Sequence, residues 1–293
     1  MNEFDLLMLG HFAVDRNVVD GVAEIASGGG VYYGGIAAAR LGARVAVVTR
    51  LAATDFPRLD AFREAGVEVF ATAAAETSGI ENTYSSADME RRICVPLGFA
   101  GPIAAADIPD LTARVYAIVP IIAGEVDLAL LKRLARRGPV ALDVQGFVRV
   151  RVGPSTSSGA ALVFRPWADM AEGLAHVTYL KVDRAEAEAL TGETSFSVAA
   201  AKLAAYGPKE IVLTQSAGVT VYADGRSYFA PFTPRSLAGR TGRGDTCFAA
   251  YLAKRLTCSP EEACRWAGAV TTLKQEQPGP WHGTLAQVKA LLG

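Results

Sequence analysis

A carboxylate set between glycines and the start of a helix marks residues 241–246. Asp245 follows Gly242 and Gly244 and directly precedes a segment with the apolar face of a helix. The first amides of a helix have no partner within it, and the helix dipole adds partial positive charge, so this position attracts phosphate. A second negative charge is unfavourable there unless it has a chemical role. We predict that Asp245 accepts the proton of an attacking alcohol while the amides hold a γ-phosphoryl group; simple capping of the helix is the alternative.

Arg243 lies between the two glycines and belongs to the predicted catalytic set with Gly242, Gly244 and Asp245. Its guanidinium could reach the transferring phosphoryl group or the substrate and stabilise negative charge. It could equally point to solvent. The sequence leaves both interpretations open.

A second glycine-rich run begins at Gly28 and Gly29 and precedes another helical segment. It does not follow the first strand directly, so the context of a dinucleotide-binding fingerprint is missing, and the chain has no Walker-type phosphate loop. These glycines permit either a tight turn or the close approach of a polyhydroxylated ligand to the backbone. Asp15 is either a turn residue or a ligand for two neighbouring hydroxyls of a polyol.

The residues above are expected to be positioned by strands and helices that alternate along the chain. Strands are expected at residues 4–9, 45–49, 115–119, 140–143, 177–181 and 211–214, and helices at 31–41, 55–65, 127–136, 183–191, 198–205 and 245–255. Such alternation predicts a mostly parallel sheet with helices on both faces, a three-layer α/β/α domain, with ligands at the carboxyl ends of the strands. At one such end, Asp143 and Gln145 meet the substrate, meet the nucleotide phosphates or form an ordinary turn.

Two segments break this rhythm and look like strands without an intervening helix. We expect residues 13–30 and 77–98 to form a small β lid that closes over the substrate and excludes water. Its exposed edge would invite pairing with a second subunit, so a homodimer through the lid is possible. Separately, Asp224 and Gly225 between two short strands predict a hairpin.

The composition narrows the class of protein. A chain of 293 residues with 51% apolar content can bury a large core, and we expect a single domain over residues 1–293. A net charge of -1 without a basic face argues against nucleic acid as a partner. The N-terminus lacks the basic region of a signal peptide and no stretch is apolar enough to span a membrane, so a cytoplasmic protein is expected. The four cysteines show no zinc-ligand spacing.

Several segments, in their order along the chain, resemble the ribokinase-like (PfkB) family of ATP-dependent sugar and nucleoside kinases. The segment 239–245 is similar to the family's Asp-Thr-x-Gly-Ala-Gly-Asp motif, from which Gly239, Arg240 and Arg243 depart. Gly28 and Gly29, followed by residues 39–42, match the di-glycine to Ala-Arg-Leu-Gly segment, with Tyr33 where asparagine is common. The resemblance implies a kinase whose substrate contacts Asp15, Gly28, Gly29, Tyr33, Asp143 and Gln145.

The resemblance also implies a nucleotide and metal site. Asp183 and Glu186 are similar to the family's Asn-x-x-Glu motif, linked to magnesium and phosphate, with Asp183 in place of Asn. Both side chains would lie on one helix face, where two carboxylates can hold a hydrated Mg2+ through its waters; a solvated Glu186 is the alternative. ATP would contact Asp183, Thr214, Ser216, Gly218, Gly242 and Gly244.

Residues 28–33 and 141–147 resemble the branch of this family that includes myo-inositol kinases, which implies myo-inositol or a similar cyclic polyol as acceptor. A kinase for fructose or ribose, and a nucleoside kinase using Phe12, Tyr32 and Tyr33 to clamp a base, stay open. A non-catalytic sugar or nucleotide sensor is a rival of another class, and Asp245 argues against it. The sequence leaves the phosphorylated hydroxyl and the donor used in the cell undecided.

Overall fold

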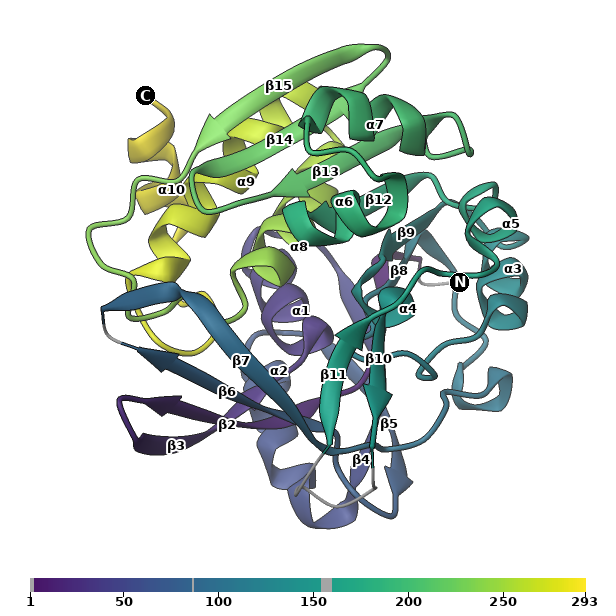
Figure 1. The fold of residues 1–293 in the computed structure, drawn as a ribbon, viewed down its shortest axis with the longest axis vertical. Coiled ribbons are helices and arrows are strands. Elements are labelled where there is room, and N and C mark those ends of the chain that lie inside the picture. Colours follow the sequence, from purple (N-terminus) through teal and green to yellow (C-terminus); the bar gives the residue numbers. More distant parts are fainter. Residues whose placement is uncertain (1–2, 86, 154–159) are drawn as a thin grey trace.

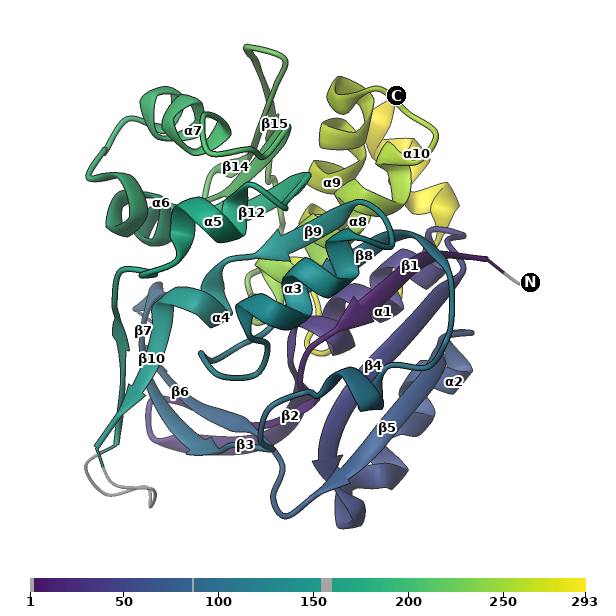
Figure 2. The same cartoon turned by 90° about the vertical axis from the view of Figure 1, so that its right-hand side faces the viewer.

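The computed structural model describes residues 3–85, 87–153 and 160–293. Its centre is a nine-stranded sheet in the order β15-β14-β13-β12-β9-β8-β1-β4-β5 (Figures 1 and 2). All neighbouring strands are parallel except the pairs β13/β14 and β14/β15. The strands are β1 (Phe4–Leu9), β4 (Val45–Ala52), β5 (Glu68–Ala74), β8 (Ala113–Ile118), β9 (Val140–Asp143), β12 (Tyr179–Asp183), β13 (Glu210–Thr214), β14 (Gly218–Ala223) and β15 (Arg226–Pro231).

Alternation of side chains along each strand gives the sheet two buried faces. In β1, Leu6 and Met8 pack into one hydrophobic cluster, whereas Leu7 and Leu9 pack into the other. A strand covered on both faces reads as a continuous apolar run, which is why residues 4–9 could be recognised in the sequence. The expected three-layer α/β/α architecture is confirmed.

Helices cover both faces (Figure 2). One face carries α1 (Gly30–Arg40), α2 (Asp60–Glu64), α8 (Arg243–Arg255), α9 (Pro260–Gln275) and α10 (Leu285–Leu292). The other carries α3 (Leu128–Ala135), α4 (Gln145–Val148), α5 (Met170–Leu174), α6 (Arg184–Thr191) and α7 (Phe196–Ala204). Within the described residues, each helix is too short or too polar to cross a bilayer.

Two local features show how sequence signals became structure. The helix expected at residues 55–65 begins as a 3-10 helix, η1 (Ala53–Leu59), before α2, because Pro57 offers no amide for a continuous α-helix. The expected hairpin joins β14 and β15, and its two turn residues, Asp224 and Gly225, have φ of 49° and 74°. Asp-Gly accepts this left-handed conformation at low strain. A second short 3-10 helix, η2 (Ala105–Asp107), precedes β8.

A second sheet, here called the lid sheet, has the order β3-β2-β6-β7 and lies beside the main sheet, at the lower left of Figure 1. It is built from β2 (Ala13–Val19), β3 (Val22–Gly28), β6 (Gly79–Ser85) and β7 (Asp88–Gly98). The hairpin of β10 (Arg149–Val152) and β11 (Ala161–Phe164), which the sequence did not predict, lies next to β7.

Candidate active site

The carboxyl ends of three neighbouring parallel strands meet at one edge of the main sheet. Asp143 ends β9, Asp183 ends β12 and Thr214 ends β13, and the register pairs Asp183 with Thr214. Their side chains lie at the end of the sheet where open α/β sheets bind ligands.

The N-terminus of α8 faces this edge across a small cleft, here called the polar cleft, of about 110 Å³. The residues that line it are polar, charged or glycine: Gln145, Lys181, Asp183, Thr214, Arg240, Gly242, Arg243, Gly244 and Asp245. Three of them are cationic. The cleft therefore offers positive charge and helix-terminal amides together, a combination that binds phosphate.

Gly242 shapes the loop that leads into α8. It is the N-cap residue, with φ of 80°, and a Cβ at this position would overlap the ring of Tyr33. Both its backbone conformation and its contact therefore require glycine. Asp245 is the third residue of the helix and not its cap, so simple N-capping does not account for this carboxylate.

Lys181 is the centre of a buried ionic cluster beside the cleft. Its ammonium lies 3.0 Å from Asp143 Oδ2 and 3.5 Å from Glu186 Oε2, and all three side chains are buried. Burial alone would lower the pKa of Lys181, but the carboxylates of Asp143 and Glu186 outweigh it and raise that pKa. Burial raises the pKa of Asp143, and it raises the pKa of Glu186 to about 7; Lys181 opposes both shifts.

Asp183 and Glu186 cap α6 reciprocally. Glu186 N donates to Asp183 Oδ1 at 2.8 Å, and Asp183 N donates to Glu186 Oε2 at 2.7 Å. This capping box explains the Asp-x-x-Glu spacing at the helix start. Glu186 is fully buried, so the alternative of a solvated charge does not hold, and its Oε1 has no hydrogen-bond partner among the described residues.

A second group forms around Tyr33 of α1. Its buried ring contacts Gly242, and its hydroxyl donates to Ser27 O at 3.3 Å. Burial raises the pKa of Tyr33 well above its ordinary value, and the charges of Asp15 and Asp245 add to the effect. Tyr33 therefore lies within electrostatic reach of both the expected acceptor ligand and the expected base.

Asp15 lies on β2 and turns toward the glycine run. A Cβ at Gly28 would overlap its carboxylate, and Asp15 Oδ1 accepts a hydrogen bond from Ile80 N at 2.9 Å. Gly29 is the N-cap of α1 and has φ of 96°. The structure thus brings Asp15 and Gly28 into contact, and a ligand shared by them stays a prediction.

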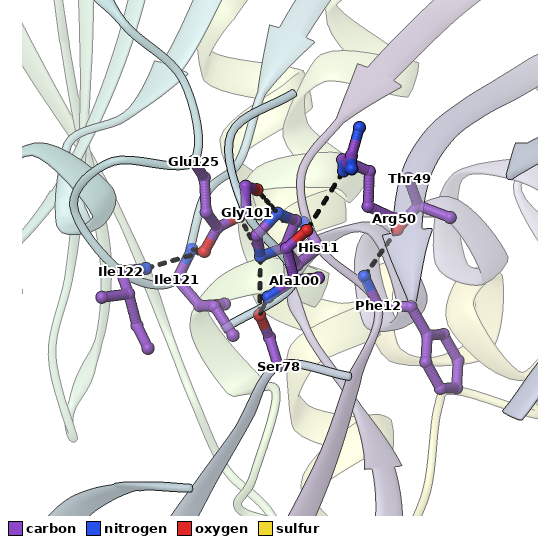
Figure 3. Close-up of polar contacts among 10 residues, drawn as sticks. All are labelled: His11, Phe12, Thr49, Arg50, Ser78, Ala100, Gly101, Ile121, Ile122 and Glu125. Atoms are coloured by element: carbon purple, nitrogen blue, oxygen red, sulfur yellow. Dashed lines mark hydrogen bonds and ion pairs between the residues drawn. The ribbon is translucent and has the colours of Figure 1, made fainter. Parts of the chain in front are cut away.

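The position of β2 is set by a buried polar cluster around His11 (Figure 3). His11 Nε2 donates to the carbonyl of Gly101 at 2.8 Å, so Nδ1 is left to accept from Ser78 Oγ at 2.7 Å. Ser78 in turn accepts from Ala100 N at 3.0 Å. One imidazole therefore joins three chain segments at the junction of the two sheets.

Glu125 completes the cluster from the main-sheet side. Its Oε2 accepts from His11 N at 2.9 Å, and its Oε1 accepts from the amides of Ile121 and Ile122 at 2.8 Å each (Figure 3). The side chain is fully buried. Since these polar groups are satisfied inside the protein, the base of the lid sheet is held firmly and Asp15 is carried on a fixed strand.

Other candidate residues lie outside the polar cleft. Ser216 is exposed in the turn after β13, and Gly218 pairs with Pro231 in the hairpin. Neither lines the cleft, whereas Thr214 and Gln145 do. The nucleotide contacts expected at Ser216 and Gly218 therefore lie apart from the expected phosphate contacts.

Two lysines of the site were missed in the sequence. Lys181 lies inside an apolar strand, and a charged residue in a buried strand was the available signal. Lys274, near the end of α9, is buried and donates to the carbonyl of Gly239. It also lines a cavity of about 240 Å³ between the lid sheet and the loop that precedes α8, together with Tyr33, Tyr84 and Arg240.

Residues 9–284 match the family model described as pfkB family carbohydrate kinase. Among curated protein sequences, none matches the chain significantly. The family model thus covers the lid sheet, the main sheet except for β1 before Leu9, and every residue of the polar cleft.

Solved structures give a narrower likeness. A pyrophosphate-dependent kinase in the ribokinase family, complexed with a pyrophosphate analog and myo-inositol, is 36% identical over 97% of this chain and 99% of its own, with a TM-score of 0.88. A sulfate complex of a pyrophosphate-dependent kinase in the ribokinase family is 37% identical over 94% and 97%, with a TM-score of 0.87. Ribokinase from Arabidopsis thaliana, complexed with ribose and ATP, is 20% identical over 99% of both chains, with a TM-score of 0.76, and shows the fold.

Proposed function

The chain belongs to the pfkB family of carbohydrate kinases, and from this premise we propose that it phosphorylates a cyclic polyol, with myo-inositol as the acceptor and pyrophosphate as the donor. Family membership makes it a phosphotransferase that acts on a hydroxyl group. The observation that carries the proposal is the carboxylate of Asp245 in the first turn of α8, in a cleft that the cationic side chains of Lys181, Arg240 and Arg243 also line.

Asp245 would accept the proton of the attacking hydroxyl. The amides at the start of α8 and the guanidinium of Arg243 would hold the transferred phosphoryl group, whose charge is spread over its oxygens in the transition state. Gly244 has no side chain and leaves room for the phosphoryl group to approach the backbone, whereas Gly242 shapes the loop and packs on Tyr33. Charge supports a catalytic task for Asp245, because a pure binding site gains little from a carboxylate beside phosphate.

The acceptor site would lie between Asp15 and Asp245, beside Tyr33. Asp15 can accept hydrogen bonds from two neighbouring hydroxyls, and Gly28 leaves room for its carboxylate beside the glycine run. Asp143 would act indirectly, through Lys181, while Gln145 faces the cleft itself. Support for myo-inositol comes from the 36% identical kinase whose complex contains it.

Pyrophosphate is favoured over ATP as the donor by the lining of the polar cleft. Among the described residues that line it, none offers the apolar surface that a nucleoside base packs against. Three cations suit a compact donor that carries all its charge on phosphate. Two similar kinases, at 36% and 37% identity, are pyrophosphate-dependent, whereas the similarity to the ATP-bound ribokinase is only 20%. ATP is the second candidate donor.

A magnesium ion fits this site as an ion held through water. Asp183 lines the cleft, and Glu186 retains one carboxylate oxygen without a hydrogen-bond partner among the described residues. Among these residues, no group of three or more Asp, Glu, His or Cys side chains is arranged to bind a metal directly. Contact through water is therefore the arrangement that fits. When bound, Mg2+ would neutralise charge on the donor phosphates. Asp183 and Glu186 would orient its waters from the start of α6.

The test is a matrix of acceptors and donors with the purified chain. Myo-inositol and other inositols, hexoses, pentoses and nucleosides are each offered with pyrophosphate or ATP, and phosphorylated product is measured by mass spectrometry. We expect the highest kcat/KM for myo-inositol with pyrophosphate. Preference for a nucleoside or an ordinary sugar would overturn the acceptor, and preference for ATP would overturn the donor.

Absence of turnover with every pair would overturn the kinase proposal itself and favour a sensor on the same scaffold. Calorimetric measurement of myo-inositol and pyrophosphate binding separates a sensor, which binds them without turnover, from a chain that binds neither. Turnover in wild type that is lost in Asp245→Asn, with binding retained, supports transfer through Asp245. Turnover that survives the substitution contradicts it.

A further inference from the structure

Lys274 is a buried cation at the point where α9 meets the loop before α8. Its side chain is 2% exposed, its ammonium donates to the carbonyl of Gly239, and it lies 5.1 Å from the ring centroid of Tyr33. Among the residues that the structure describes, no carboxylate forms an ion pair with it. A buried lysine without such a partner is unfavourable for stability and needs another explanation.

The partners of Lys274 belong to both ends of one short loop. Gly239 begins the loop, donates from its amide to Gln275 O at 2.8 Å, and lies too close to the backbone of Lys274 for a side chain. Gly242 ends the loop and packs on Tyr33, the ring over which the ammonium lies. Lys274 therefore contacts the first residue of the loop directly and the last one through Tyr33.

We propose that Lys274 is a positioning residue for phosphoryl transfer: its ammonium fixes residues 239–242, and with them the anion-binding start of α8, and places positive charge near Asp245. This inference rests on the proposed function for its catalytic consequence. The anchoring itself is a property of the loop and can be measured without turnover.

The charge state of Lys274 provides a signature. Burial lowers the pKa of Lys274 to about 7, and Asp245 only partly offsets this effect. The titratable and charged groups that interact with it or line the same cavities are Asp245 on α8, Tyr32 and Tyr33 on α1, Glu24 on β3, Tyr84 on β6, Arg235 and Arg240 before α8, and Glu276 and His282 after α9. An anionic donor in the cleft favours the ammonium form, so binding should raise this pKa.

Loss of the proton from Lys274 should therefore lower the activity of the free enzyme at alkaline pH. Because kcat/KM reports the free enzyme, it should decrease as pH rises above about 7, whereas kcat should hold to higher pH. Substitution of Lys274 should remove this alkaline decrease from kcat/KM. An alkaline decrease that persists unchanged in the variant would overturn the assignment.

The decisive variants are Lys274→Met and Lys274→Arg, with Lys254→Met as a matched control. Lys254 also donates to a backbone carbonyl, that of Leu41 at 3.1 Å, and also lies over an aromatic ring, that of Trp266, but it contacts no residue of the loop. We expect kcat to fall about 10- to 100-fold in Lys274→Met, as for a misplaced catalytic group, with partial recovery in Lys274→Arg. Lys254→Met should stay within about twofold of wild type.

Hydrogen exchange of the amides of residues 240–244 tests the anchoring independently of catalysis. Exchange should become faster in Lys274→Met and stay unchanged in Lys254→Met. Exchange and kcat that both match wild type would overturn the proposal. If wild type turns over no acceptor, the proposed function fails, and the exchange result still decides the role of Lys274.

Discussion

Lys181 and Lys274 are buried to the same degree, 3% and 2% exposed, and both are within electrostatic reach of Asp245, yet their pKa values move in opposite directions. Lys181 faces the carboxylates of Asp143 and Glu186, which raise its pKa. Lys274 faces a carbonyl and an aromatic ring, and burial lowers its pKa to about 7.

The difference shows that the partner, and not burial, decides what a buried lysine can do. With two carboxylates, Lys181 is a permanent cation whose removal would leave buried negative charge behind. Without one, Lys274 changes its charge in the neutral range, which is typical of functional sites. The two lysines thus offer a fixed and a variable positive charge to the same carboxylate, the proposed base Asp245.

Asp245, which acts on both lysines, is the position of the largest expected effect. Asp245→Asn keeps the size of the side chain and removes the proposed base, so kcat should fall about 10³-fold while the fold is retained. Steady-state kinetics with myo-inositol and pyrophosphate measures the loss, and thermal unfolding serves as the control. A kcat within tenfold of wild type would place the base elsewhere.

Breaking the Lys181 cluster should affect stability more than any other single change. In Lys181→Met, two buried carboxylates lose their cation, and we expect a loss of about 3 to 5 kcal/mol in the free energy of unfolding. Urea denaturation at pH 7 measures it. The KM for pyrophosphate should also rise, because the cleft loses one of its three cations.

The pH dependence of Lys181→Met identifies the cause of that loss. Without the ammonium, the folded-state pKa values of Asp143 and Glu186 rise further above their unfolded values. The folded variant then binds more protons than the unfolded one, so its deficit should shrink as pH falls toward 5. A deficit that stays constant between pH 5 and 8 points to lost packing instead of unpaired charge.

Gly242 tests the contact through which Tyr33 joins Lys274 to the loop. Gly242→Ala adds a Cβ that overlaps the Tyr33 ring and forces alanine into the left-handed region, so we expect a loss of about 2 to 4 kcal/mol in stability and a lower kcat. Gly225→Ala is the control, since Gly225 has φ of 74° and open space around it. It should lose only the backbone contribution, about 1 kcal/mol, and keep its activity.

The features that could be predicted from sequence are those set by residues close together in the chain. The strands β1 and β9 were predicted with the bounds that the structure gives, because strands buried on both faces are continuous apolar runs. The Asp224-Gly225 turn was found from its backbone preference. Asp245 and its glycines were recognised because neighbours in sequence form that site. The edge strand β5, which is only partly buried, gave no such signal.

Lys181 and Lys274 were not recognised in the sequence because their partners lie far away in the chain. Lys181 is 38 residues from Asp143, and Lys274 is 35 residues from Gly239. Their types alone suggest ordinary surface lysines. The Asp183-x-x-Glu186 pattern likewise supports two functions, a helix cap and a water-mediated metal site, and only the hydrogen bonds identify the cap.

The smallest expected effect concerns Lys274→Met and has the opposite sign from Lys181→Met. In wild type, the folded-state pKa of Lys274 is about 7 against an ordinary value of 10.5. Between these pH values the unfolded chain binds more protons at this site, so wild type gains stability as pH rises from 7 to 10. Below pH 7 the variant avoids a buried ammonium but loses the bond to Gly239 and the contact with Tyr33, which leaves a net stabilisation of about 1 kcal/mol. Urea denaturation from pH 6 to 10 should show that the greater stability of Lys274→Met disappears at alkaline pH. If instead the variant's stability relative to wild type grows with pH, Lys274 has an ordinary or raised pKa, as Lys181 does, and the contrast between the two lysines is wrong.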